Sequence, residues 1–207
     1  MPTTITALLT TALAAGVALA GVPTPERQVQ FRSVDLVGNV VELHNFGAEA
    51  QPLDGWRFCT HSNGQARRYT GASSLNGVSI PAGDSIFVYI NNDAPAGAEN
   101  FNASDLGNFA NNFGQGPYAL QLFWPNGGSL SFGSTADMVD HAQWSVGGVG
   151  NAVAQSRSQQ AVNAGLWSGA TDFIVTSGNS ESIDLIPEGG ESHAPADDLV
   201  TEPALGC

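Results

Sequence analysis

The stretch VVELHNFG (residues 40–47) decides how the rest of this chain is interpreted. Successive side chains of an extended strand point to opposite faces, so Val41 and Leu43 share one face. Glu42 and His44 share the other face, about 7 Å apart. The first face is apolar and is predicted to lie in a core, whereas the second is predicted to be partly exposed. This alternation favours one strand of a β-sandwich.

The same Glu42–His44 pair also permits a second interpretation, in which the two side chains perform acid–base chemistry. Catalysis requires a nucleophile or a metal that converges on the pair, and the sequence supplies neither convincingly. Asn45 suits the turn that ends a strand, because its side chain can bond to nearby backbone. A hydrolase is therefore the less favoured reading. It predicts that Glu42 and His44 lie in a concave pocket with a third polar group.

Short β-rich runs recur between turn residues along most of the chain, with Gly38-Asn39 and Asp54-Gly55 as turn pairs. This spacing is typical of an all-β sandwich. The runs are QVQFRSVDL (28–36), VVELHNF (40–46), WRFCT (56–60), RRYT (67–70), GVSI (77–80), DSIFVYI (84–90), YALQLFW (118–124), LSF (130–132), MVDHAQW (138–144), DFIVT (172–176) and SIDLI (182–186).

One segment, NASDLGNFANNF (residues 102–113), departs from this pattern. Asn102 is a suitable N-cap, with Asp105 three residues later. The apolar residues at 106, 109, 110 and 113 fall at helical spacing. The sequence therefore predicts one short helix inside the long connection 91–117, and long connections are either functional or disordered.

Several motifs resemble the lamin-tail domain family in their order along residues 28–177. Its strand ending in Glu-Leu-x-Asn corresponds to residues 42–45, and its apolar-Asp-Gly-Trp segment corresponds to residues 53–56. SIPAGDSIFVYINNDAP resembles the family's Pro-x-Gly turn and following strand, MVDHAQW its Val-Asp strand, and AQSRSQQAVNAGLW its closing Ser-x-Arg region. Bacterial members occur on exported proteins.

The resemblance implies an immunoglobulin-like β-sandwich with an accessory, structural or binding role, and no catalysis. Five residues are then expected to specify the fold rather than to contact a ligand: Glu42, Asn45, Gly55, Trp56 and Arg157. For Arg157 we expect an ion pair with a carboxylate at the edge of the core, either Glu42 or Asp140.

The charge balance limits the choice of partners. The 207 residues include 19 acidic side chains against six basic ones, for a net charge of −13, and all six basic residues are Arg. Such a chain opposes binding to nucleic acid or to anionic lipid, because both require Lys or Arg to neutralise phosphates. The composition fits an exported acidic protein.

The sequence divides into four parts. Residues 1–20 resemble a signal peptide that ends in Ala18-Leu19-Ala20, an A-x-A cleavage pattern, although no Lys or Arg precedes the apolar run. An uncleaved membrane anchor is the alternative. A linker (21–27), the sandwich domain (28–186) and an acidic flexible tail (187–207) follow. Cys59 and Cys207 either pair in an oxidising compartment or are unrelated thiols.

Residues 91–117 also offer candidate ligand groups. Asn92, Asp93 and Asp105 could supply oxygens to calcium, although the EF-hand pattern is absent. Trp124 precedes a turn and could contact a carbohydrate. The four histidines show no zinc-binding spacing, and Asp140 and His141 should point to opposite faces of one strand.

We therefore expect no catalytic residue, no cofactor and no metal, with calcium as the one alternative. The predicted function is that of an exported, non-enzymatic domain, secreted, periplasmic or on the cell surface, with an unknown protein or glycan partner at the cell envelope. A calcium- or carbohydrate-binding module is the first alternative.

Overall fold

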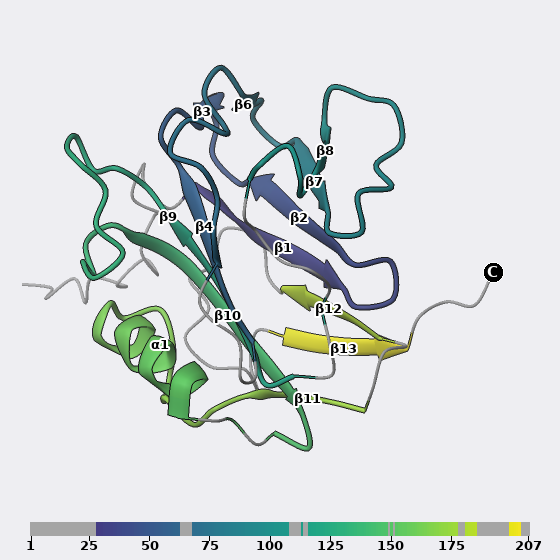
Figure 1. The fold of residues 1–207 in the computed structure, drawn as a ribbon, viewed down its shortest axis with the longest axis vertical. Coiled ribbons are helices and arrows are strands. Elements are labelled where there is room, and N and C mark those ends of the chain that lie inside the picture. The colour runs from purple at the N-terminus through teal and green to yellow at the C-terminus, as the bar shows by residue number, and fades with distance from the viewer. Residues whose placement is uncertain are drawn as a thin grey trace, which may run out of the picture.

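The structure is a computed structural model that describes residues 28–62, 68–107, 113, 116–148, 150, 152–177, 181–185 and 199–203 (Figure 1). The predicted signal peptide and linker and the residue Cys207 lie outside these ranges. The expected cleavage therefore remains a prediction, and a Cys59–Cys207 pair remains one of two alternatives. Cys59 itself is buried in a strand. Within the described residues no helix is long and apolar enough to cross a membrane.

The first layer of the fold is a six-stranded sheet with the strand order β13-β12-β1-β2-β7-β8. β1 and β2 form a hairpin whose turn contains Asn39, at a φ of 55°, where Asn is among the few residues that are tolerated. The strands of this sheet are β1 (Val29–Asp35), β2 (Val40–Asn45), β7 (Ser85–Tyr89), β8 (Asn100–Asn102), β12 (Glu181–Leu185) and β13 (Leu199–Pro203).

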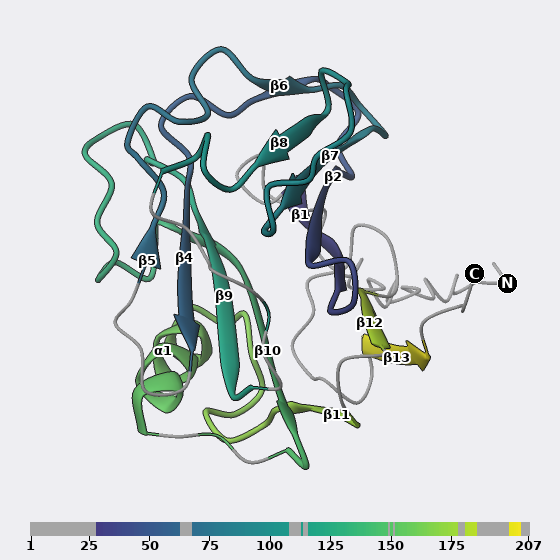
Figure 2. The same ribbon diagram turned by 45° about the vertical axis from the view of Figure 1, so that its right-hand side comes forward.

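The second layer is a five-stranded sheet with the order β11-β10-β9-β4-β5, seen beside the first in Figure 2. A separate small pair joins β3 and β6. The strands are β4 (Arg57–Ser62), β5 (Arg68–Tyr69), β9 (Tyr118–Phe123), β10 (Met138–Val146), β11 (Ile174–Thr176), β3 (Gln51–Pro52) and β6 (Ser79–Ile80).

The main core lies between the two sheets, where alternate side chains of each strand face inward. Phe31 of β1 and Phe58 of β4 meet there, with ring centroids 6.1 Å apart. Asp140 also ties the layers together, because its Oδ2 accepts a hydrogen bond from the backbone N–H of Phe31 at 2.7 Å. That N–H lies at a bulge of β1, between Phe31 and Ser33, where the ladder with β2 is interrupted.

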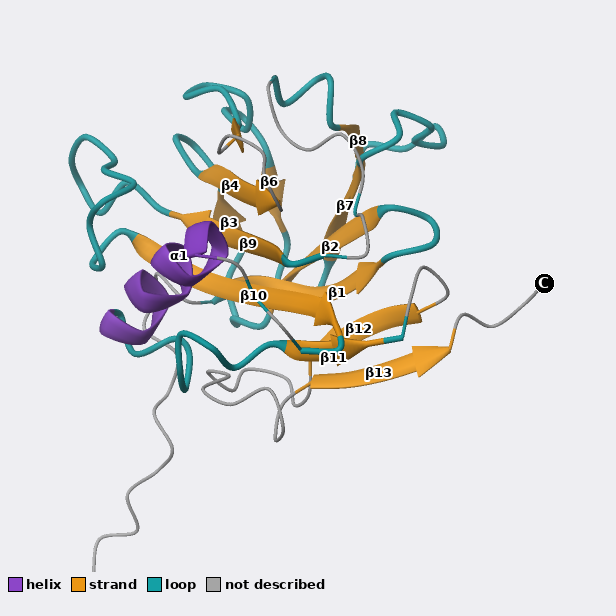
Figure 3. Ribbon diagram, turned by 60° about the horizontal axis from the view of Figure 1, so that its bottom comes forward, coloured by secondary structure: helices purple, strands orange, loops and turns teal. Residues whose placement is uncertain are grey.

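The only helix of the described residues, α1 (Ala152–Asn163), packs on the outer face of the five-stranded sheet (Figure 3). The sheet face beneath it is polar, since Gln121, His141 and Gln143 lie there with at most 1% of their surface exposed. The predicted all-β sandwich with one short helix is therefore confirmed, and a polar layer under the helix adds to it.

The position of the helix was predicted wrongly. Residues 100–102 form β8, residues 103–106 form turns, and Gly107 has a φ of 89° that an α-helix does not allow. Leu106 and Phe113 are buried as expected, but they pack against the core without a helix across 102–107. Residues 108–112 lie outside the described ranges.

Two further predictions need correction. Residues 130–132 form no strand. The region beyond Pro187 was expected to be a flexible tail, yet Leu199–Pro203 form β13, which pairs antiparallel with β12. Residues 187–198 and 204–207 lie outside the described residues.

The motif residues Gly55 and Trp56 have clear structural roles. Gly55 has a φ of 74°, and a Cβ atom there would lie 3.0 Å from Cγ of Pro125. Glycine avoids both the backbone strain and the contact. The side chain of Trp56 is 1% exposed in the core.

Asn45 at the end of β2 holds three chain segments together. Its Nδ2 donates to the carbonyl oxygens of Glu49 at 2.7 Å and of Ile80 at 2.9 Å, and its Oδ1 accepts from the N–H of Gly47 at 2.9 Å. The residue is fully buried. These bonds explain why a strand that begins with alternating apolar residues ends on an asparagine.

Asn45→Ala should lower the free energy of unfolding by about 2 kcal/mol, because it leaves the buried Ile80 carbonyl without its donor. Asn45→Asp is the matched control: it keeps an acceptor for Gly47 and removes both donors, so it should be similarly destabilising. Urea unfolding followed by circular dichroism measures both. Values for the two variants within about 0.5 kcal/mol of the wild type would contradict this role for Asn45.

Candidate functional site on the outer face of the six-stranded sheet

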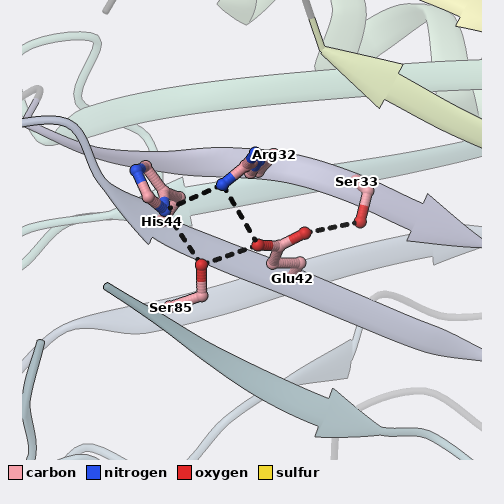
Figure 4. A network of polar contacts seen from close by, with 5 residues as sticks. All are labelled: Arg32, Ser33, Glu42, His44 and Ser85. Carbon is pink, nitrogen blue, oxygen red and sulfur yellow. Dashed lines mark hydrogen bonds and ion pairs between the residues drawn. The ribbon is translucent and has the colours of Figure 1, made fainter. Parts of the chain in front are cut away.

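A network of five polar side chains lies on the face of β1, β2 and β7 that points away from the core (Figure 4). Strand register brings it together: Ser33 pairs with Glu42, and His44 pairs with Ser85. Arg32 completes the network from the bulge of β1. The shared face of Glu42 and His44 is the one predicted from the alternation in VVELHNFG.

The centre of the network is the hydroxyl group of Ser85. Its Oγ lies 2.6 Å from Oε1 of Glu42 and 2.9 Å from Nδ1 of His44. The other carboxylate oxygen of Glu42 accepts from Oγ of Ser33 at 3.0 Å. One chain of donors satisfies these contacts: His44 Nδ1–H donates to Ser85, and Ser85 donates to Glu42.

Arg32 adds a cation at the rim of the network. Its Nη1 lies 3.9 Å from Oε1 of Glu42 and 3.4 Å from Nδ1 of His44. The Arg32 side chain is 47% exposed, whereas that of Glu42 is only 16% exposed. An ion pair this long and this exposed contributes little to stability, so Arg32 screens Glu42 rather than clamping it.

The order of these groups differs from that of a serine hydrolase. In a catalytic triad the imidazole lies between the hydroxyl and the carboxylate, so that it can take the hydroxyl proton. Here the serine lies in the middle and its proton is directed to Glu42. The imidazole of His44 is held from its other side by the ring of Phe46, at 4.4 Å between centroids in an edge-on contact. The geometry crosslinks three strands, and in this order of donors the imidazole donates to the hydroxyl instead of taking its proton.

A groove of about 870 Å³ lies beside the network, at the start of β7. Ser85 lines it, but Glu42 and His44 do not. The third polar group that a hydrolase requires is therefore present, but of the three residues only Ser85 lines this groove. The lining residues are Gly77, Val78, Ser79, Pro81, Gly83, Asp84, Ser85, Ile86, Phe87, Ala98, Glu99 and Phe101.

This groove borders a strand edge that β8 covers only in part. The backbone N–H of Phe87 donates to the carbonyl of Glu99, and the carbonyl of Tyr89 accepts from the N–H of Ala103. The backbone N–H and C=O groups of odd-numbered residues in β7 are therefore directed toward β8. The β7–β8 ladder begins at Phe87. The backbone of Ser85, two residues earlier, therefore points to the same side, into the groove.

The candidate calcium ligands do not converge. Asn92 Oδ1 accepts from the N–H of Ser104 at 2.7 Å, and Asp105 Oδ2 accepts from the N–H of Asn102 at 3.2 Å. Asp93 is exposed. Among the described residues no three His, Cys, Asp or Glu side chains form a group that could hold a metal. Asn92 and Asp105 brace the 91–107 connection instead.

Trp124 is half-buried and packs against the core. It does not line the groove. The carbohydrate alternative therefore has no support from this residue, although Ala98, Glu99 and Phe101 of the 91–117 connection do form one wall of the groove.

The expected ion pair of Arg157 with Glu42 or Asp140 is replaced by other contacts. Glu42 pairs with Arg32 on the other sheet, and Asp140 points into the core toward Phe31. Arg157 lies in α1 and donates to the carbonyl of Phe132, to Gln160 and to the hydroxyl of Tyr69. The sequence alone does not show that Glu42 lies on the other sheet, or that Asp140 faces the core from the sheet whose outer face α1 covers.

His141 was correctly placed on the face opposite Asp140. It lies under α1, where its Nδ1 is 3.2 Å from Nε2 of Gln121 and its Nε2 is 2.8 Å from Oε1 of Gln143. Burial lowers the pKa of His141 from 6.5 to about 4, and the positive charge of Arg157 acts in the same direction. The imidazole is therefore neutral at physiological pH and has a structural role.

Comparison of the sequence with models of known protein families and with curated proteins finds no significant match. The likeness to lamin-tail domains thus depends on the motifs themselves, of which Asn45, Gly55 and Trp56 have structural roles in this fold.

Proposed function

We propose that this chain is an exported, non-enzymatic binding domain of lamin-tail type that takes an extended segment of a partner protein into the groove beside β7. The observation that supports this most directly is the backbone of Ser85, which points into the groove just before β8 begins. An added peptide can bond to such an edge through its own main chain.

The charge of the groove indicates the chemistry of the partner. Asp84 and Glu99 line it and are exposed, and no basic side chain is among its lining residues. The half-buried ring of Phe87 offers an apolar contact between them. A segment with Lys or Arg at some positions and apolar residues at others fits this surface, and the net charge of −13 would speed its approach.

The order of the polar network supports a non-catalytic role. Ser85 donates to Glu42, so its proton is not directed to an imidazole as it is in a Ser–His pair. The network instead fixes β7 against β2 and so holds the edge in place.

A selection from a random peptide library tests the proposal. Peptides enriched in Lys and Arg should be recovered, and a double charge reversal, Asp84→Lys with Glu99→Lys, should weaken their binding at least about tenfold. Both positions are exposed, so the melting temperature should change little. The matched control, Asp93→Lys with Asp172→Lys, makes the same charge change outside the groove and should bind as the wild type does.

Three results would count against the proposal. Equal loss in the two double variants would mean that only overall charge matters. Binding on a glycan array, lost on Asp84/Glu99 reversal, would favour the carbohydrate alternative. Turnover of simple esters that disappears in Ser85→Ala would favour a hydrolase.

A further inference from the structure

A second site lies on the opposite side of the molecule, between α1 and the five-stranded sheet. It is a cavity of about 290 Å³ lined by Tyr69, Phe132, Gly133, Ser156, Arg157 and Gln160. This volume is near the lower end for small-molecule sites, so it suits a ligand of few atoms. No residue of the groove beside β7 is part of it.

Arg157 is the unusual residue of this cavity. Only 4% of it is exposed, although arginine is seldom fully buried without a paired anion. Its partners in the described part of the chain are all neutral: Nη1 donates to the carbonyl of Phe132 at 2.9 Å and to the side-chain oxygen of Gln160, and Nη2 lies 3.1 Å from the hydroxyl of Tyr69. Its buried Nε–H has no acceptor within the described residues.

A buried cation surrounded by neutral groups is costly, because the interior solvates charge less well than water does. An anion within the cavity would supply the missing counter-charge. The planar guanidinium group binds oxyanions through two parallel N–H bonds, and Nε and Nη2 form one such edge, which an anion reaches once the shielded Nε is uncovered. Tyr69 adds a third donor, since its oxygen accepts from Arg157 and its proton remains available.

A second arginine adds to the positive potential. The guanidinium carbon of Arg57 lies 4.6 Å from the ring centroid of Phe132, and Arg57 donates to the carbonyl of Thr70. Burial lowers the pKa of Arg57, and no carboxylate contributes to that shift. Two of the six arginines of this acidic chain thus contact Phe132, and Arg157 is the one that lines the cavity.

We propose that this cavity binds a small oxyanion, such as phosphate, sulfate or a monocarboxylate, with Arg157 and Tyr69 as its main contacts. The proposal is independent of the partner groove, which lies against the other sheet. It gives the buried Arg157 a binding role in addition to its structural contacts.

Titration of the purified full chain with phosphate, sulfate or acetate, each against chloride at constant ionic strength, tests this proposal. At least one oxyanion should raise the melting temperature in a saturable manner and shift the Nε–H resonance of Arg157 in ¹H–¹⁵N spectra. Comparing the three anions identifies the preferred group. No saturable response to any of them would overturn the proposal.

Variants locate the site. Tyr69→Phe removes one donor while preserving the ring that packs on Phe132 at 4.0 Å, so it should fold and bind about tenfold more weakly. Arg157→Lys retains the charge without the two-bond edge and should bind more weakly still. Arg32→Gln, on the other sheet, is the control and should bind as the wild type does. Unchanged affinity in Tyr69→Phe and Arg157→Lys, or an equal loss in Arg32→Gln, would contradict the assignment.

Discussion

Trp144→Ala should lower the free energy of unfolding by about 3–5 kcal/mol, the loss expected when a buried tryptophan is truncated. Trp144 lies in β10 and is fully buried. Its indole stacks on the ring of Tyr118, with centroids 5.1 Å apart and an interplanar angle of 11°, and meets the ring of Phe113 edge-on at 5.6 Å. Alanine would leave a cavity that rigid strands on both sides cannot fill.

Trp144→Phe separates packing from hydrogen bonding. The indole N–H of Trp144 is buried and has no acceptor in the described part of the chain, so phenylalanine loses area but no bond. It should cost clearly less than alanine. Trp124→Ala is a second control, because Trp124 is only half-buried and should lose less. Urea unfolding followed by circular dichroism gives all three values. If Trp144→Ala lowers the free energy of unfolding no more than Trp124→Ala does, the packing role assigned to Trp144 is contradicted.

Alternation of side chains predicted most of the strands that pack in the sandwich. DSIFVYI places apolar residues at every second position, VVELHNF does so at Val41 and Leu43, and MVDHAQW does so except at Asp140. These runs form β7, β2 and most of β10. This pattern is local, so one sequence is enough to read it. β13 was missed because its residues follow an acidic segment rich in Pro and Gly, and only its pairing with β12 makes it a strand.

The helix was missed for a different reason. α1 has the sequence AVAQSRSQQAVN, with no acidic residue in its first turn and no marked apolar face. The sheet beneath it is itself polar, so α1 buries Arg157 and Ser158 against Gln121 and Gln143. Apolar periodicity therefore indicates a helix only where the surface it covers is apolar.

The candidate site was predicted in part. Glu42 and His44 share a strand, so their common face follows from sequence. Ser85 lies 41 residues beyond His44, and only strand register places its hydroxyl between the two. Register depends on which strands pair in the assembled sheet, and the pairing of distant strands cannot be predicted from the side-chain pattern of one sequence. The same limit hid the contact of Arg157 with Tyr69, 88 residues away.

Lowering the pH from 7 to 4 should destabilise the fold through His141 by about 3 kcal/mol. The folded chain keeps this imidazole neutral, because burial lowers its pKa to about 4, whereas the unfolded chain protonates it near 6.5. Between these two values the unfolded state binds the extra proton. The contribution of His141 to the free energy of unfolding is therefore fully present above pH 6.5, declines as the pH falls, and changes no further below about 4.

The contacts of His141 explain why the added proton is not accommodated. Gln121 Nε2 donates to Nδ1, and Nε2–H donates to Oε1 of Gln143, which also accepts from the hydroxyl of Ser158. A second ring proton would face the Gln121 donor. Urea unfolding across this pH range measures the effect against His141→Gln, which retains a neutral donor and acceptor. The carboxylates titrate alike in the wild type and the variant, so the wild type should lose about 3 kcal/mol more of its free energy of unfolding between pH 7 and 4. If the two plots of unfolding free energy against pH run parallel, His141 is not the cause of the pH dependence.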